Sequence, residues 1–200
     1  MKLYWCPQTR ASRAVWMLEE LGRPYERVRI DIRNEASRAD PEFRAASPMG
    51  KVPSLVDGPV KLWDSGAICI YLADAYPEAG LGAPIGDPKR GAFLQWAMYT
   101  NSVVEPAMGE RFAGHAVNTV QSGHGSFDQM IDLLIAGLTP GPWILGERFT
   151  MADVLVGASV NFMDMFKILP DRAELKAYVE RCRARPAFQR AMSYETAAAA

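Results

Sequence analysis

A Val52-Pro53 pair begins a short apolar run, Val52 to Val56, that has the pattern of a strand. Peptide bonds that precede proline adopt the cis form at modest cost, unlike other peptide bonds. A cis bond here would turn the Val52 N–H and C=O away from a neighbouring strand, so that an extended peptide could pair with them. The alternative is that Pro53 starts an edge strand, where its missing N–H is tolerated.

Asp64-Ser65-Gly66 is a second candidate site, because it directly precedes a predicted helix over 67–75. Ser65 has the position of an N-cap, whose hydroxyl binds the free N–H groups of the first helical turn. The amides of a helix N-terminus also attract carboxylates. The segment therefore predicts a helix cap that can also bind an anion.

The cysteines and histidines offer little for metal or triad chemistry. Cys6, Cys69 and Cys182 lie far apart and in none of the paired spacings that hold zinc or form a redox dithiol. Cys6 is late in a predicted strand, where a cysteine usually acts as a small hydrophobe, with redox chemistry as the alternative. Since only His115 and His124 are present, neither a histidine-built metal site nor a Ser-His-Asp triad is predicted. No metal and no permanently bound cofactor are expected.

The charge balance excludes one large class of partners. The 200 residues include 22 basic and 23 acidic side chains, for a net charge of −1. Because a protein that neutralises many phosphates carries an excess of Lys and Arg, nucleic acid is not a predicted partner. No stretch is long and apolar enough to span a membrane, and the N-terminus lacks the apolar run of a signal peptide. A cytoplasmic protein is predicted.

Residues 1–80 alternate strand-like and helix-like segments. Gly22 ends the first predicted helix, Asp40-Pro41 begins the second, and Asp57-Gly58 favours a tight hairpin. Strands are predicted over 2–6, 25–32, 52–56 and 60–63, and helices over 11–21, 41–46 and 67–75. The order is βαβ followed by αββα, which indicates an α/β domain.

The strand pattern disappears after residues 81–88, a stretch rich in Gly and Pro that is predicted to be a linker. Thr150-x-x-Asp153 is a capping box, and Phe149 with Val154 can form a hydrophobic staple, so this motif is assigned a structural role. The predicted domains are 1–80, the linker, and an all-helical domain over 89–200. Its helices are predicted over 89–113, 126–138, 152–166, 172–184 and 187–192.

Three segments in order carry a resemblance to a known family: Ser12 to Glu26, Ser47 to Leu55, and Asp64 to Ile68. They resemble the first helix, cis-proline loop and glutathione-binding turn of the cytosolic glutathione transferases. The resemblance continues to Phe149–Asp153 and so covers nearly the whole chain. It implies a thioredoxin-like N-terminal domain (α/β) followed by an all-α C-terminal domain.

The resemblance also implies which residues hold glutathione as a co-substrate. Its cysteinyl part is expected to pair with the Val52 main chain beside Lys51 and Pro53, by strand addition. Its γ-glutamyl carboxylate is expected at Ser65, with Asp64 facing the amino group. Many relatives carry Glu or Gln where this chain has Asp64.

At the catalytic position the chain departs from the better-known classes. Thr9 falls where similar delta-class enzymes carry a catalytic Ser, and Arg10 falls where beta-class enzymes carry Cys. We expect the Thr9 hydroxyl to bind the glutathione thiolate, with Arg10 and the start of the first helix adding positive potential. Ser12 is the alternative donor, or a first-turn residue of that helix. Tyr4 is not favoured as a catalytic residue.

Trp5, Tyr99, Met108 and Phe112 are candidates for the acceptor pocket, although aromatic and Met spacing on a helix more often indicates core. The family also implies a homodimer, for which Tyr99, Val103 and Val104 are the predicted exposed face. The predicted function is transfer of the glutathione thiolate to an electrophilic, mostly apolar acceptor, as in detoxification. The alternatives are a glutathione-dependent disulfide or peroxide reductase or isomerase, and a non-catalytic binding or regulatory protein.

Overall fold

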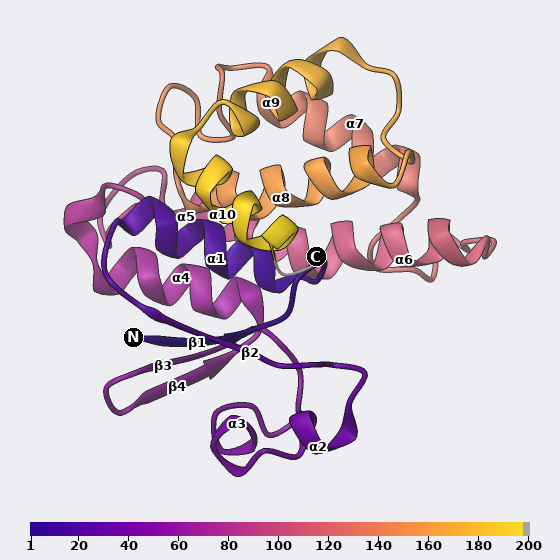
Figure 1. Ribbon diagram of the computed structural model, residues 1–200. Coiled ribbons are helices and arrows are strands. Elements are labelled where there is room, and N and C mark those ends of the chain that lie inside the picture. The colour runs from indigo at the N-terminus through magenta and orange to yellow at the C-terminus, as the bar shows by residue number, and fades with distance from the viewer. Residues whose placement is uncertain (198–200) are drawn as a thin grey trace. The chain divides into compact units, whose positions relative to one another are not determined.

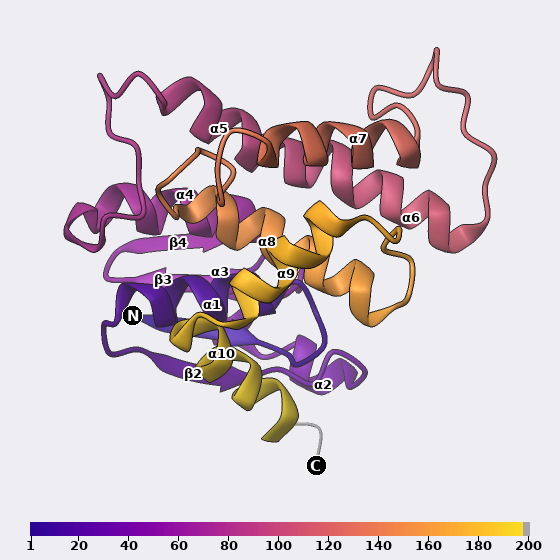
Figure 2. The same cartoon turned by 90° about the horizontal axis from the view of Figure 1, so that it is seen from above.

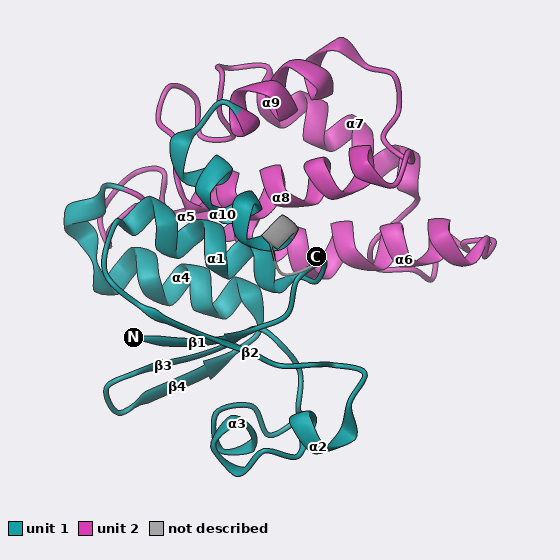
Figure 3. Ribbon diagram, viewed as in Figure 1, with its two compact units in different colours: residues 1–80, 184–200 teal, residues 81–183 magenta. Residues whose placement is uncertain are grey.

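The computed structural model describes residues 1–197 of the chain. These residues form two compact units (Figure 3). Unit 1 comprises Met1–Gly80 together with the described residues from Ala184 onward, and unit 2 comprises Leu81–Arg183. No helix among the described residues is long and apolar enough to cross a membrane.

Unit 1 is built on a four-stranded sheet with the order β2-β1-β3-β4. The central strand β1 pairs in parallel with β2 and antiparallel with β3, and β3 pairs antiparallel with β4. Helices α1 and α4 lie on one side of the sheet, and α2 and α3 lie on the other (Figures 1 and 2). The elements are β1 Lys2–Trp5, α1 Ala11–Leu21, β2 Glu26–Arg29, α2 Glu35–Arg38, α3 Pro41–Ala46, β3 Ser54–Asp57, β4 Val60–Trp63, α4 Ser65–Ala75 and a 3₁₀ turn Pro77–Ala79.

The alternation of side chains along β1 explains these two layers. Leu3 and Tyr4 are both buried, and successive strand residues point to opposite faces of a sheet. Tyr4 packs against Phe43 of α3, with ring centroids 5.4 Å apart, in a cluster that includes Ile30 and Ala46. The sheet is therefore covered on both faces, as expected for a thioredoxin-like domain.

Local signals predicted most of these elements. Helix α1 begins and ends where it was expected, and Gly22 closes it in the left-handed conformation (φ 67°) while donating its N–H to the Leu18 carbonyl at 3.2 Å. Asp40 caps α3 by accepting from the Phe43 N–H at 2.8 Å. Strand β2 is shorter than predicted and ends at Arg29, which pairs with Trp5, the last residue of its partner β1. Helix α2, capped by Asn34, was not predicted.

Unit 2 is entirely helical among its regular elements, as predicted. The predicted 89–113 helix is α5 and α6 joined by a π-helical turn, Thr100–Val104. Pro106 follows this turn, and because proline has no N–H it cannot pair with the Ser102 carbonyl in the α-helical pattern. The helices are α5 Arg90–Tyr99, α6 Glu105–Ala113, α7 Phe127–Leu138, α8 Met151–Met165 and α9 Ala173–Arg183.

Helix α8 forms the centre of unit 2, and its N-terminus has the predicted capping box. The Asp153 carboxylate accepts from the N–H groups of Thr150 at 2.9 Å and Ile144 at 2.8 Å, and from the Tyr178 hydroxyl at 3.0 Å. Asp153 is fully buried. Burial raises its pKa to about 6 against the lowering effect of these hydrogen bonds.

The last helix, α10 (Pro186–Ala197), belongs to unit 1, so the predicted helical domain over 89–200 is wrong in its final segment. Phe188 packs edge-on against Trp16 of α1, with ring centroids 4.9 Å apart. Just before the helix, Arg185 forms two hydrogen bonds of 2.6 and 2.7 Å with Glu20 of α1. The chain thus returns to its first domain through contacts between residues far apart in sequence.

Candidate functional site

The loop between β1 and α1 contains the predicted catalytic residues, and Thr9 organises it. The Thr9 hydroxyl donates to the Cys6 carbonyl at 2.7 Å and accepts from the Ala11 N–H at 3.2 Å. Gln8, one residue earlier, has φ 57°, a left-handed conformation that is uncommon for residues other than glycine. In this structure the Thr9 proton is therefore used within the loop, and binding to a ligand requires the hydroxyl to rotate.

The two neighbouring candidates lie at the start of α1. Arg10 occupies the N-cap position of α1, and its side chain makes no capping hydrogen bond. The Ser12 hydroxyl donates to the Thr9 carbonyl at 3.0 Å, so Ser12 has the first-turn role that the sequence left open. Thr9 and Ser12 are joined in one hydrogen-bonded segment, which brings all three predicted catalytic residues together.

A cavity of about 330 Å³ adjoins this loop within unit 1. Cys6, Gln8 and Thr9 line it on one side. Residues from the end of β2 onward line the other side, and they include Arg29, Asp31 and Arg33. No role was predicted for these two arginines, since Arg29 lies in the predicted half-buried strand over 25–32 and Arg33 directly follows it.

Of the three cysteines, all buried, Cys6 is the one that lines this cavity. Burial raises the pKa of Cys69 to about 12, which disfavours its reactive thiolate form. Cys182 is fully buried in α9. Cys69 and Cys182 are therefore core residues.

The Val52-Pro53 segment lies at the entrance to β3, and its peptide bond is cis as predicted. The loop before it is fixed by Ser47, whose hydroxyl donates to the Lys51 carbonyl at 2.8 Å and accepts from the Lys51 N–H at 3.0 Å. Within residues 1–197, neither the N–H nor the C=O of Val52 forms a hydrogen bond. Val52 is partly exposed and Lys51 is exposed, so both can be reached by a ligand.

Helix α4 starts two residues earlier than predicted, which changes the role of Ser65. The N-cap is Asp64, in a left-handed conformation (φ 77°), and its carboxylate accepts from the N–H groups of Gly66 at 2.8 Å and Ala67 at 3.2 Å. The prediction that Ser65 caps the helix is therefore wrong, because Ser65 is the first helical residue. Among the described residues, the Ser65 N–H has no partner.

Ser65 instead contacts Arg13, a buried residue of α1 for which no role was predicted. The Arg13 Nη1 donates to the Ser65 hydroxyl oxygen at 3.3 Å. A hydroxyl that accepts from a guanidinium keeps its own proton for another acceptor. Arg13 thus adds positive charge beside the predicted carboxylate site.

The acceptor-pocket candidates lie in different environments. Trp5 is buried in the sheet of unit 1. Tyr99 and Met108 are buried in unit 2, where the Tyr99 hydroxyl donates to the Met130 carbonyl at 3.0 Å, and this is the core role that the sequence left open. Phe112 is 47% exposed and packs against the rings of Phe162 and Phe166.

The predicted dimerisation face is also corrected by burial. Val104 is fully buried and Tyr99 is nearly so within the chain itself, so these two residues do not form an exposed face. The π-helical turn changes the direction of the side chains that follow Tyr99, which a regular helical pattern does not anticipate.

Unit 2 brings a serine, a histidine and a glutamate together. His124 Nε2 lies 2.7 Å from Glu110 Oε2. The Ser122 Oγ is 2.8 Å from Nδ1 and 2.9 Å from Nε2 of the same ring, so it is not aligned with either nitrogen lone pair. This geometry does not suit proton transfer from a nucleophilic serine. No group of three or more potential metal ligands occurs in the part of the chain that the structure describes.

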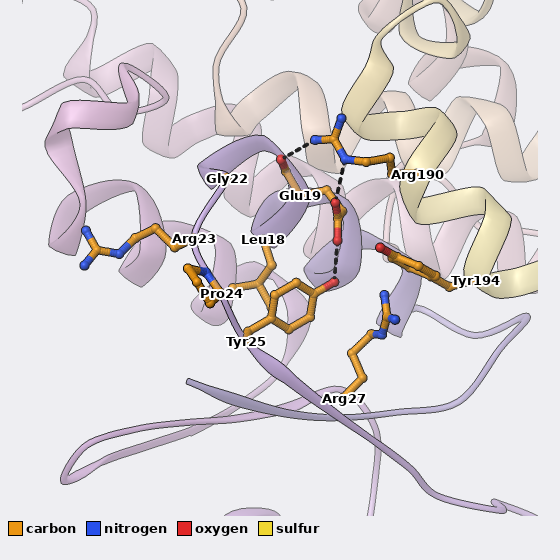
Figure 4. Close-up of a pocket in the computed structure, with 9 residues that line it drawn as sticks. All are labelled: Leu18, Glu19, Gly22, Arg23, Pro24, Tyr25, Arg27, Arg190 and Tyr194. Carbon is orange, nitrogen blue, oxygen red and sulfur yellow. Dashed lines mark hydrogen bonds and ion pairs between the residues drawn. The ribbon is translucent and has the colours of Figure 1, made fainter.

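A second cavity in unit 1, of about 470 Å³, lies between α1, β2 and α10 (Figure 4). Its polar side chains bind one another. Glu19 accepts from Arg190 Nε at 2.8 Å and from the Tyr25 hydroxyl at 2.9 Å, and the Arg27 guanidinium stacks on the Tyr194 ring at 3.2 Å from its centroid. Burial and the hydrogen bond to Glu19 raise the pKa of Tyr25. This network attaches α10 to the rest of unit 1.

Comparison with known proteins gives matches to both units. The family model for the glutathione S-transferase N-terminal domain matches residues 1–74, and the model for the C-terminal domain matches residues 111–181. The disulfide-bond oxidoreductase YfcG of Escherichia coli (strain K12) is 28% identical over 204 residues, covering 95% of this chain and 93% of that protein.

Two solved structures are similar over nearly the whole chain. A glutathione transferase from Methylococcus capsulatus str. Bath has a TM-score of 0.84 at 28% identity, covering 98% of each chain. A sphingomonad glutathione S-transferase in complex with glutathione has a TM-score of 0.80 at 25% identity, covering 98% of this chain and 99% of that chain. The expected thioredoxin-like and all-α fold is thereby confirmed.

Proposed function

Because this chain belongs to the glutathione S-transferase family, we propose that it activates the thiolate of glutathione for attack on an electrophilic, mostly apolar acceptor. The observation that carries the proposal is the Val52 main chain, whose N–H and C=O have no partner within residues 1–197 and lie at an exposed strand entrance. These two groups suit the main chain of an extended peptide such as glutathione.

The start of α4 supports a place for the γ-glutamyl end. Asp64 occupies the N–H groups of Gly66 and Ala67, which leaves the Ser65 N–H and hydroxyl for a carboxylate. The buried Arg13 behind Ser65 adds favourable charge. Asp64 is exposed and can meet the ligand's amino group, and Lys51 adds a cation beside Val52.

The β1–α1 loop supports thiolate stabilisation by Thr9, Arg10 and Ser12. A thiol with a pKa of about 8.5 is only a few per cent ionised at neutral pH, so lowering it by about two units requires roughly 2.7 kcal/mol of preferential stabilisation of the anion. A hydroxyl donor, a guanidinium and a helix N-terminus each favour an anion. Thr9 and Arg10 supply the first two, and α1 supplies the third.

A glutathione-dependent disulfide reductase is the second candidate function. It is favoured by the similarity to a relative named a disulfide-bond oxidoreductase, which extends over 95% of this chain. The loop has Thr9 and Arg10 and no cysteine at either position, so the electron pair for reduction would come from glutathione itself. Parallel assays of thiol conjugation and disulfide reduction with the same enzyme preparation distinguish the two activities.

Thermal unfolding with glutathione tests the binding step that both activities require. A ligand that binds only the folded state at 100 times its Kd stabilises it by about 2.7 kcal/mol. We expect the midpoint of thermal unfolding to rise as glutathione reaches millimolar concentrations. It is expected to stay unchanged in buffer without glutathione that is adjusted to the same ionic strength. No shift at any concentration would reject glutathione binding and favour a non-catalytic protein.

We further propose that the protein is a homodimer, as the family resemblance implies. Since Tyr99 and Val104 are buried within the chain, the interface must use other residues. Sedimentation velocity across micromolar concentrations gives the oligomeric state directly, and a monomer throughout would reject the dimer.

A further inference from the structure

Helix α10 contacts the β1–α1 loop through Glu195, near the end of the described chain. The Glu195 Oε2 accepts a hydrogen bond from the Gln8 main-chain N–H. Gln8 is the residue with the left-handed backbone, and it directly precedes Thr9. Because residues other than glycine adopt this conformation rarely, an outside contact to the Gln8 amide helps to define the loop.

The second carboxyl oxygen of Glu195 has an unusual environment. Within residues 1–197, Glu195 Oε1 is a buried side-chain oxygen without a hydrogen-bond partner. A buried ionised carboxylate with an unpaired oxygen is unfavourable, and burial raises the pKa of Glu195, opposed by its hydrogen bond from Gln8. The hydrogen bond from the Gln8 N–H thus opposes the effect of burial on this carboxyl group.

We propose that Glu195 is a positioning residue for the thiolate-stabilising loop, acting through the Gln8 amide on the placement of Thr9 and Arg10. The expected effect on the reaction rate rests on the proposed function, whereas the contact between Glu195 and Gln8 does not. It makes the C-terminal helix part of the glutathione-activating machinery, although α10 is separated from the loop by nearly the whole chain.

Three variants test this role. Glu195→Ala removes the acceptor, whereas Glu195→Gln keeps an acceptor oxygen and carries no charge. Arg190→Ala is the matched control, because it removes the contact of the same helix with Glu19 and leaves the Gln8 contact unchanged (Figure 4). The three variants therefore separate loss of the Gln8 contact from general loosening of α10.

The first readout needs no ligand. Hydrogen exchange at the Gln8 amide is expected to accelerate on the order of tenfold in Glu195→Ala, and to stay near the wild-type rate in Glu195→Gln and Arg190→Ala. Equal exchange rates in Glu195→Ala and wild type would show that Glu195 does not hold the Gln8 amide, and would overturn the proposal. This result stands whether or not glutathione is the substrate, so it is distinguishable from failure of the proposed function.

The second readout is the conjugation or reduction rate with glutathione. Because a misplacement of about 1 Å in a catalytic group can cost about 100-fold in rate, we expect kcat to fall about tenfold in Glu195→Ala while the KM for glutathione changes less than about twofold. Glu195→Gln is expected to restore kcat to within about twofold of wild type. If Glu195→Gln is as slow as Glu195→Ala, or if Arg190→Ala is equally slow, the positioning role is rejected.

Discussion

The Arg13 Nη1 donates a hydrogen bond of 3.3 Å to the hydroxyl oxygen of Ser65, and both side chains are buried. This contact joins the first turn of α1 to the first residue of α4. Since the hydroxyl accepts from Arg13, its own proton remains available to a ligand carboxylate. The glutathione site that we propose is thus supported by a charged group from the same helix that begins at the catalytic loop.

Ser65→Ala is therefore expected to weaken glutathione binding about tenfold or more, since a hydrogen bond to a charged group contributes about 1.5–3 kcal/mol. The variant also leaves Arg13 without this acceptor, and we expect a loss of about 1–3 kcal/mol in the free energy of unfolding. Isothermal titration with glutathione and urea unfolding measure the two effects. Unchanged affinity would remove Ser65 from the site.

Asp64→Asn is the control at the neighbouring position. Asn and Asp are comparable N-cap residues, so the free energy of unfolding is expected to change by less than about 0.5 kcal/mol. If the Asp64 carboxylate meets the amino group of glutathione, the affinity still falls several-fold. An affinity equal to that of the wild type would limit Asp64 to its capping role.

The buried Asp153 predicts a pH dependence of stability. Burial raises its pKa to about 6 in the folded state, from an ordinary value of 3.8, so between these two values the folded protein binds more protons than the unfolded chain. The contribution of Asp153 is therefore most favourable below about pH 4, declines as the pH rises, and is least favourable above about pH 6. The full difference is roughly 3 kcal/mol.

Urea unfolding at pH 4 and pH 7 compares the wild type with Asp153→Asn. The variant is expected to lose the decline between these pH values, whatever its absolute stability. Asp128→Asn, which removes an exposed carboxylate in the first turn of α7, is the matched control. If the free energy of unfolding of Asp153→Asn still declines between pH 4 and pH 7, groups other than Asp153 cause the decline.

The attachment of α10 to α1 gives a further prediction. Arg185 holds both carboxylate oxygens of Glu20, whose side chain is only 7% exposed. Because Arg185→Ala leaves a nearly buried carboxylate without this partner, we expect a loss of about 3 kcal/mol in the free energy of unfolding. Arg190→Ala breaks a more exposed ion pair and is expected to cost less than about 1 kcal/mol. Similar losses in the two variants would contradict this distinction.

The sequence predicted the elements whose ends carry local signals. Gly22 closes α1, Asp40-Pro41 starts α3, and Thr150 with Asp153 caps α8, because each of these contacts joins residues only a few positions apart. The segments that we propose to bind glutathione were identified in the sequence for the same reason, since each motif is contiguous. Their assembly in one unit is consistent with the family's order of motifs.

What the sequence did not predict depends on contacts over long separations. The Gln8–Glu195 and Glu20–Arg185 contacts join residues 187 and 165 positions apart, and no periodicity indicates such pairs. The burial of Tyr99 depends on the Met130 carbonyl of another helix. The change of capping residue from Ser65 to Asp64 required the left-handed backbone of Asp64, which sequence patterns rarely indicate for aspartate.

Thr9 carries the prediction that decides the chemistry. Thr9→Val keeps the shape of the side chain and removes the donor, so the pKa of the bound glutathione thiol is expected to rise by about one unit, equivalent to the 1–2 kcal/mol typical of a hydrogen bond to a charged group. Glutathione affinity is expected to change little, because the other contacts remain. The variant also loses the hydrogen bonds to Cys6 and Ala11, so Thr9→Ser, which retains the hydroxyl, is its matched control.

Arg10→Ala and Ser12→Ala separate the remaining contributions. Arg10→Ala is expected to raise the thiol pKa with a stronger dependence on salt, because a partly exposed charge is screened and a short hydrogen bond is screened less. Ser12→Ala is expected mainly to reduce stability, since its hydroxyl binds the Thr9 carbonyl at 3.0 Å. Thiolate absorbance of bound glutathione, titrated against pH in each variant, measures these shifts. If Ser12→Ala alone raises the thiol pKa, Ser12 and not Thr9 donates to the thiolate.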